Sequence, residues 1–248
     1  MKVTEEMVDE ARDEKAQDEL AWVPLKTEHL VRDRWIDFRR EEYLMPDGTT
    51  FSPFYNYSKR NYAVILARDE EGKYLCVRQY RHGIRQVTTE FVAGGLEYAT
   101  ASHADMGVLK HVVTSDADVA SLGCTGIDGE NRETMRIPEL LPGMEEIVYE
   151  DALDAAKREL LEETGYVSEE WEKLITLPSH ATLSDDYVHV FVAKHCHRVS
   201  GQELDDTEFL NVVRLTAQEL EARITEGEFQ QAVHVMAWYM AKDRGFLA

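Results

Sequence analysis

The stretch RELLEETGY, residues 158–166, closes a predicted amphipathic helix and stops it at a glycine. Its three glutamates, Glu159, Glu162 and Glu163, fall in the last turn, where unpaired carbonyl groups already carry partial negative charge and basic residues are favoured. Their spacing places them on one face of the helix, where like charges repel each other. A divalent cation such as Mg²⁺ or Mn²⁺ would remove this conflict, because hard cations take carboxylate oxygens as ligands.

The alternative is a solvated acidic helix face, because the chain holds 48 acidic against 27 basic residues and has a net charge of −21. The order of the neighbouring residues favours a site. It reads Arg-Glu-apolar-x-Glu-Glu-x-Gly-apolar, and seven residues separate Glu150 from Arg158. This order resembles the second half of the Nudix box, the signature of hydrolases that cleave nucleoside diphosphates linked to another moiety.

The first half of the box departs from the family pattern. A glycine is expected where Met144 stands, and Gly143 is displaced by one position. A better match is EFVAGGLE, residues 90–97, which resembles the strand and turn that open the box in ADP-ribose pyrophosphatases. With Gly94 as the box glycine, roughly 45 extra residues, from about Tyr98 to Glu146, separate the two halves, far more than an ordinary loop. We interpret this insert as an excursion or a small subdomain beside the site.

Two further segments carry the resemblance. Residues 62–67 predict a buried strand with a hairpin partner at 74–81, where Arg81 is similar to the family arginine that meets the substrate's phosphates. Arginine suits this task because its planar fork pairs with two oxygens, and the alternative is a surface ion pair. The acidic loop 202–209, followed by a strand at 212–215, resembles the loop from which relatives take an acid that activates water or completes the metal shell. Any single acid of this loop could equally be solvated.

The N-terminal part divides at about residue 20. Residues 1–20 predict a charged helix or tail, and residues 21–58 resemble the small β-rich domain that ADP-ribose pyrophosphatases place before a catalytic domain, here 59–248. In that family it helps to build a dimer and an adenine-stacking site. Trp35, and less strongly Trp22, are candidates for the stacking platform, although burial is the commoner fate of a tryptophan.

Composition excludes several classes of protein. The sequence holds no apolar run long enough to cross a membrane, and the acidic N-terminus lacks the apolar region of a secretory signal. Cys76, Cys124 and Cys196 have no metal-binding spacing and fit a reducing cytoplasm. Strong acidity disfavours nucleic acid as a partner, because binding to its phosphates requires a basic surface.

The resemblance implies a Nudix fold of the α/β (α+β) class, with a mixed sheet between helices and an N-terminal β-rich extension. It implies Mg²⁺-dependent hydrolysis, with Mn²⁺ as a possible substitute, of the diphosphate in a small nucleoside diphosphate sugar. The first candidate is ADP-ribose, giving AMP and ribose 5-phosphate. A homodimer is carried over from the family.

The same resemblance assigns site residues. The metal ligands would be Glu159, Glu163 and the carbonyl of Ala93, with Glu162 completing the shell. Catalytic acids would come from the list Glu162, Glu163, Asp205, Asp206 and Glu208, and substrate contacts from the list Trp35, Arg81, Glu90 and Gly94. Two other readings stay open: a sensor that binds ADP-ribose without turnover, and a non-catalytic interaction protein whose box is disabled by the insert.

Overall fold

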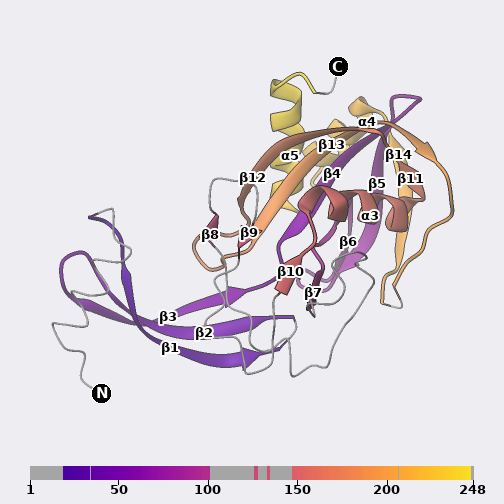
Figure 1. Ribbon diagram of the computed structural model, residues 1–248. Helices are drawn as coiled ribbons and strands as arrows, with labels where there is room; N and C mark the ends of the chain where they lie inside the picture. Colours follow the sequence, from indigo (N-terminus) through magenta and orange to yellow (C-terminus); the bar gives the residue numbers. More distant parts are fainter. Residues whose placement is uncertain are drawn as a thin grey trace. The chain divides into compact units, whose positions relative to one another are not determined.

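The computed structural model describes residues 19–33, 35–100, 126–127, 133–134, 147–205 and 207–246. The described chain divides into two compact units (Figure 1). Among the described residues, the first unit contains 19–33, 35–59, 126–127, 133–134 and 180–185, and the second contains 60–100, 147–179, 186–205 and 207–246. The helix or tail predicted for residues 1–20 lies outside the described residues, except for its last two positions.

The first unit is built on a three-stranded antiparallel sheet in the order β1 (Val23–Arg32), β2 (Asp37–Leu44) and β3 (Thr50–Ser58). A turn joins β2 to β3, and Gly48 allows it because its φ of 82° is left-handed. Two short strands, β8 (Gly126–Ile127) and β9 (Glu133–Thr134), pair with each other. Strand β1 has no counterpart among the strands predicted from the sequence.

The second unit contains a seven-stranded mixed sheet in the order β11-β13-β4-β6-β5-β14, and its seventh strand, β12, also pairs with β13. Among its described strand pairs, only β13 and β4 run parallel. The bounds of these strands are β4 Tyr62–Asp69, β5 Tyr74–Arg81, β6 Gln86–Gly95, β11 Tyr166–Val167, β12 Glu170–Pro178, β13 Tyr187–Arg198 and β14 Leu210–Leu215.

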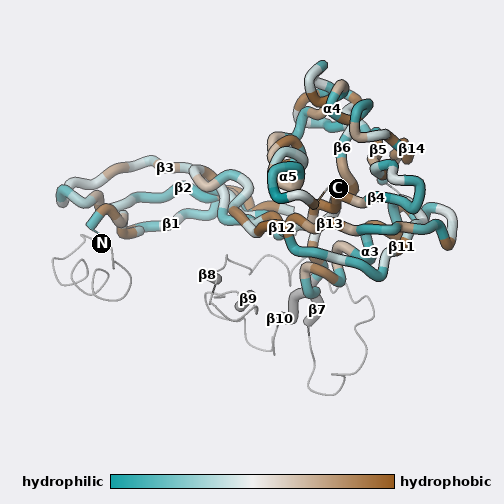
Figure 2. The backbone as a smooth tube through the Cα atoms, turned by 90° about the horizontal axis from the view of Figure 1, so that it is seen from above, coloured by the Kyte–Doolittle hydropathy of each residue, from teal (hydrophilic) through white to brown (hydrophobic). Residues whose placement is uncertain are grey.

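Alternation along β4 builds a core on each face of this sheet. Ala63 and Ile65 face helix α3 (Ala152–Thr164), whereas Val64 and Leu66 face the side of α4 (Ala217–Thr225) and α5 (Ala232–Asp243). The sheet is therefore covered on both faces, as Figures 1 and 2 show. None of the described helices has the length and apolar composition needed to cross a bilayer.

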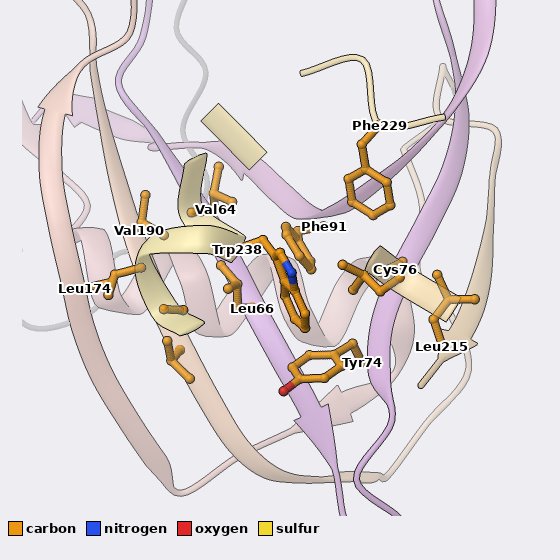
Figure 3. Close-up of a cluster of buried hydrophobic side chains, with 14 of the residues drawn as sticks. Val64, Leu66, Tyr74, Cys76, Phe91, Leu174, Val190, Leu215, Phe229 and Trp238 are labelled. Carbon is orange, nitrogen blue, oxygen red and sulfur yellow. The ribbon is translucent and has the colours of Figure 1, made fainter. Parts of the chain in front are cut away.

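The core on the α5 side is centred on an aromatic cluster (Figure 3). The ring of Trp238, from α5, meets the edge of Tyr74 with centroids 4.9 Å apart and lies 6.4 Å from Phe91. All three side chains are almost completely buried. Because such rings bury large apolar areas, this cluster fixes α5 on strands β5 and β6.

Strand β6 separates the two strands that the sequence predicted as a hairpin. Its first half, to Phe91, pairs with β5, and its second half, from Val92, pairs with β4. Direct pairing of β4 with β5 is confined to two residue pairs beside their turn. The ring of His234 accepts a hydrogen bond from the Phe91 N–H through Nδ1 at 3.0 Å. Burial lowers the pKa of His234 to about 4, so this ring is neutral and able to accept at pH 7.

The two ends of the predicted insert lie side by side. Strands β7 (Tyr98–Thr100) and β10 (Ile147–Tyr149) pair antiparallel. The N–H of Glu150 donates to the carbonyl of Glu97 at 2.9 Å, and the N–H of Glu97 donates to the Glu150 carboxylate at 3.1 Å. Except for β8 and β9, the interior of the insert lies outside the described residues.

This closed base predicts that the insert can be replaced by a hairpin turn. Because Thr100 and Ile147 are paired, Asn-Gly in place of residues 101–146 would join them by a two-residue loop of the type that antiparallel strands favour. The shorter loop costs less entropy on folding, so we expect a melting temperature that is unchanged or up to ~5 °C higher. Circular dichroism during heating measures this. Aggregation or loss of the cooperative transition would show that the segment is part of a core.

Candidate active site

Helix α3 ends at Gly165, as the sequence predicted, and begins after Asp151. The carboxylate of Asp151 caps it by accepting from the N–H groups of Leu153 at 2.8 Å and Asp154 at 3.3 Å. Gly165 ends it with a φ of 74°, and a Cβ added there would lie 2.4 Å from the Ser200 carbonyl oxygen. Only glycine fits this position for both reasons.

The apolar stripe of α3 carries two of its glutamates into the protein. Glu159 and Glu163 are one turn apart on the edge of the buried stripe, and their residues are only 8% and 3% exposed. Strand β6 meets Glu159 at Gly94, where an added Cβ would lie 1.8 Å from Cδ of Glu159. Position 94 therefore needs glycine so that the strand can approach the carboxylate.

Burial and mutual repulsion make this carboxylate pair unfavourable without a cation. Desolvation raises the pKa of Glu159 to about 7. It also raises the pKa of Glu163 well above its usual range, and the charges of Glu159 and Glu208 raise it further. A hydrogen bond from the backbone of Ala93 acts in the opposite direction. Oε2 of Glu163 is buried and accepts no hydrogen bond from any described residue.

These features fit a hard divalent cation. In the part of the chain that the structure describes, no group of three His, Cys, Asp or Glu side chains is arranged to hold a metal ion. The oxygen ligands available to such a cation are the two buried carboxylates and the backbone carbonyl of Ala93, which the sequence predicted as a ligand. Mg²⁺ is commonly bound by one or two carboxylates, with substrate phosphates and water completing its coordination. The orphan oxygen of Glu163 is the strongest local sign of such a ligand.

Arg158 organises the remaining acids. Its Nη1 donates to Glu159 at 2.8 Å and to Glu162 at 2.9 Å, while Nε and Nη2 donate to the Glu150 carboxylate at 3.0 and 2.9 Å. Nη2 also donates to the carbonyl of Gly95 at 3.1 Å. The sequence placed Arg158 and Glu150 in the motif but gave neither a role. Their register in the motif was the only signal that they act together.

The candidate catalytic acids of the loop 202–209 differ in burial and surroundings. Glu208 is half-buried, and its charge raises the pKa values of both Glu159 and Glu163, so it lies near them. Asp205 is exposed, and its N–H donates to the Glu208 carboxylate at 3.2 Å. Asp206 lies outside the described residues. The partial burial of Glu208 and the effect of its charge on the pKa values of the buried pair thus favour it over Asp205.

Arg81 is joined to a buried partner. Its Nε donates to both oxygens of Glu90, at 2.9 and 3.1 Å, its Nη2 donates to Oε2, and Thr88 donates to Oε1. Burial alone would raise the pKa of Glu90, but the hydrogen bonds and charge of Arg81 hold that pKa below its ordinary value. Glu90 is fully buried and contacts Arg81, and its contact with substrate stays a prediction. The ion pair considered for Arg81 exists, with an interior rather than a surface partner.

The two tryptophan candidates lie in the first unit. Trp22 packs edge to face against Tyr43, Phe51 and Phe54, with ring centroids 6.0 to 6.4 Å apart. Trp35 is 64% exposed beside the turn that joins β1 to β2, and its N–H donates to the Asp33 carboxylate at 2.7 Å. The stacking role of Trp35 stays a prediction, while Trp22 already uses its ring in an aromatic cluster.

Comparisons with known proteins agree with this architecture. No protein-family model matches the chain. It is 24% identical over 220 residues to a methanol dehydrogenase activator of Bacillus methanolicus, covering 86% of this chain and 88% of the relative. It is also 24% identical over 199 residues to an ADP-ribose pyrophosphatase of Bacillus subtilis (strain 168), covering 77% of each.

A solved structure has a similar fold. The crystal structure of an ADP compounds hydrolase matches with a TM-score of 0.62 at 17% identity, covering 92% of this chain and 96% of that one. The predicted Nudix fold, a mixed sheet between helices, is confirmed. The chain thus resembles the ADP-ribose pyrophosphatases of the Nudix family in fold as well as in sequence.

Proposed function

We propose that this chain is a Nudix hydrolase that cleaves the diphosphate of an ADP-sugar, with ADP-ribose giving AMP and ribose 5-phosphate. The observation that carries the proposal is the buried pair Glu159 and Glu163. Glu159 packs against Gly94, and Oε2 of Glu163 has no hydrogen-bond partner among the described residues. The names of two similar proteins, an ADP-ribose pyrophosphatase and an ADP compounds hydrolase, support the same substrate class.

Each part of the site has a role in this reaction. Glu159, Glu163 and the Ala93 carbonyl would hold Mg²⁺ or Mn²⁺, which neutralises diphosphate charge and makes a bound water more acidic. Arg158 keeps Glu159 and Glu162 in place. Glu208 would take the proton from the attacking water, with Glu162 and Asp205 as the other candidates. Arg81 would bind a phosphate through the edge of its guanidinium that Glu90 leaves free.

The similarity to an activator protein favours a second candidate function. A protein with this fold could bind an ADP-sugar and act on another protein without rapid turnover, as the name of the Bacillus methanolicus relative suggests for that protein. Both functions use a small nucleotide ligand. The homodimer expected from the family stays a prediction under either one.

A single assay separates the two functions. Purified protein is incubated with a panel of ADP-sugars, with Mg²⁺ or with EDTA, and AMP release is measured while the substrates compete with one another. The hydrolase proposal requires AMP release that depends on Mg²⁺. Binding of ADP-ribose by calorimetry without AMP release would support the second function, and neither binding nor release would contradict both.

The Arg81→Lys variant tests the phosphate contact. Lysine keeps the charge but loses the planar fork, so we expect kcat/KM for ADP-ribose to fall by roughly tenfold or more, about 1.4 kcal/mol. Arg223→Lys is a matched control, because the Arg223 side chain is 33% exposed and paired with Glu228, while the Arg81 side chain is 35% exposed. Equal and small effects at the two positions would show that Arg81 has only a structural role.

A further inference from the structure

Two backbone N–H groups of β6 donate to α5 and to the segment before it. The N–H of Thr89 donates to the carbonyl of Glu228 at 3.2 Å, and the N–H of Phe91 donates to Nδ1 of His234 at 3.0 Å. Because residues two apart in a strand direct these groups to the same edge, the chain that leads into α5 satisfies this edge of β6. Phe91 is also the last residue of β6 that pairs with β5 before the strand passes to β4.

His234 is held in place as an acceptor. The residue is only 3% exposed, and its ring lies nearly parallel to that of Phe91, with centroids 6.0 Å apart. Trp238 follows one turn later on the same face of α5 and packs against Tyr74 and Phe91 (Figure 3). This helical turn is therefore fixed against the sheet at both of its ends. A backbone N–H can only donate, so Nδ1 of His234 carries no proton in this arrangement.

The residues on either side of Phe91 belong to the candidate active site. Glu90 precedes it and forms the ion pair with Arg81. Gly94 follows three positions later and lies so close to Glu159 that an added Cβ would be 1.8 Å from Cδ. A small shift of β6 would therefore change both the ion pair and the contact with the buried carboxylate.

We propose that His234 is a positioning residue for the candidate metal site. By accepting from the Phe91 N–H, it fixes β6 at the point where the strand changes partners. The restraint keeps the Ala93 carbonyl available to a divalent cation and keeps Gly94 in contact with Glu159. His234 acts from the α5 side of the sheet, opposite to α3, and touches neither cation nor substrate. This inference rests on the metal site of the proposed function and extends it to a residue outside that site.

Loss of the acceptor should weaken cation binding through the position of β6. Leucine at position 234 fills similar space but leaves the buried Phe91 N–H without its acceptor, which is unfavourable. The strand then spends part of its time displaced, where this N–H finds another partner. A cation binds only the molecules in which β6 keeps its native position, so a native fraction of about one tenth weakens binding about tenfold.

Mn²⁺ binding tests the proposal without any substrate. Mn²⁺ is titrated into the wild type, His234→Leu and His234→Asn, and free Mn²⁺ is measured by electron paramagnetic resonance. Asparagine places its side-chain carbonyl oxygen close to the position of Nδ1, so it can keep the hydrogen bond while it loses much of the packing. We expect His234→Leu to bind Mn²⁺ about tenfold more weakly, and His234→Asn to stay within about threefold of the wild type.

A control variant separates positioning from a general loss of stability. Leu220→Ala opens a cavity in the same buried core, on α4, and should lower the melting temperature as His234→Leu does. Because it removes no hydrogen-bond acceptor, it should leave Mn²⁺ affinity at the wild-type value. The proposal is overturned if Leu220→Ala weakens Mn²⁺ binding as much as His234→Leu, if the leucine and asparagine variants are weakened alike, or if His234→Leu binds Mn²⁺ normally.

The His234→Gln variant keeps the test decisive should His234→Leu not fold. Glutamine is one methylene longer than asparagine, so its carbonyl oxygen is displaced from the position of Nδ1 although the side chain stays polar. We expect His234→Gln to bind Mn²⁺ about threefold more weakly than His234→Asn. Equal affinities of these two variants would count against the proposal.

Failure of this inference and failure of the proposed function have different signatures. A wild type that shows the expected Mn²⁺ pattern but releases no AMP removes the hydrolase proposal and leaves the role of His234 standing. An active hydrolase whose His234→Leu variant binds Mn²⁺ normally keeps the function and removes the role of His234. A wild type that binds no Mn²⁺ overturns the metal site and this inference together.

Discussion

We expect the Glu163→Gln variant to hydrolyse ADP-ribose at least ~100-fold more slowly than the wild type, a loss of about 3 kcal/mol of transition-state stabilisation. Glutamine keeps the shape of the side chain but removes the charge that a hard cation requires. Steady-state rates of AMP release at saturating Mg²⁺ measure the effect. Glu159→Gln should behave in the same way, because its carboxylate shares the buried site.

Stability provides an independent check on the same residue. With EDTA present, the Glu163→Gln protein should melt at the same temperature as the wild type or higher, because the substitution removes a desolvated charge that Glu159 repels. Adding Mg²⁺ should raise the melting temperature of the wild type only. Glu172→Gln is the control, because Glu172 is an exposed partner of Lys194. A Glu163→Gln enzyme with a near-normal rate would refute the metal assignment.

The local features of the candidate site could be predicted from the sequence. The limits of α3 follow from Asp151 and Gly165, whose cap and left-handed turn depend only on neighbouring backbone groups. The burial of Glu159 and Glu163 is shown only by the structure, whereas the shared helix face of Glu159, Glu162 and Glu163 follows from their spacing. Such features depend on short-range rules, so one segment is enough to show them.

Features that depend on distant pairings could not be predicted. Nothing in residues 62–81 indicates that β6 enters between β4 and β5, because strand order depends on the whole sheet. The pairing of Arg81 with Glu90 therefore could not be predicted. In the same way, the choice between Asp205 and Glu208 depends on how the acidic loop lies over α3, and their spacing in the sequence does not fix this.

The hydrogen-bond network around Arg158 should contribute strongly to the stability of the protein. One guanidinium bonds to Glu150, Glu159 and Glu162, and it also ties α3 to the Gly95 carbonyl on β6. The side chains of Arg158 and Glu150 are only 20% and 17% exposed. Removing the arginine leaves several carboxylates close together with little solvent, and an uncompensated charge of this kind is more costly than the loss of a surface pair.

We expect Arg158→Met to lower the free energy of unfolding by about 3 kcal/mol, because methionine fills similar space without charge. Urea denaturation of metal-free protein measures the loss. Adding Glu150→Gln to this variant should restore part of the lost free energy of unfolding, because it removes one of the carboxylates that no longer has an arginine partner. Glu150→Gln alone should destabilise the wild type. Arg223→Met, at a more exposed pair with Glu228, should lose much less. Equal losses for Arg158→Met and Arg223→Met would mean that the network is solvated, and the same solvation would weaken the case for a desolvated cation site on α3.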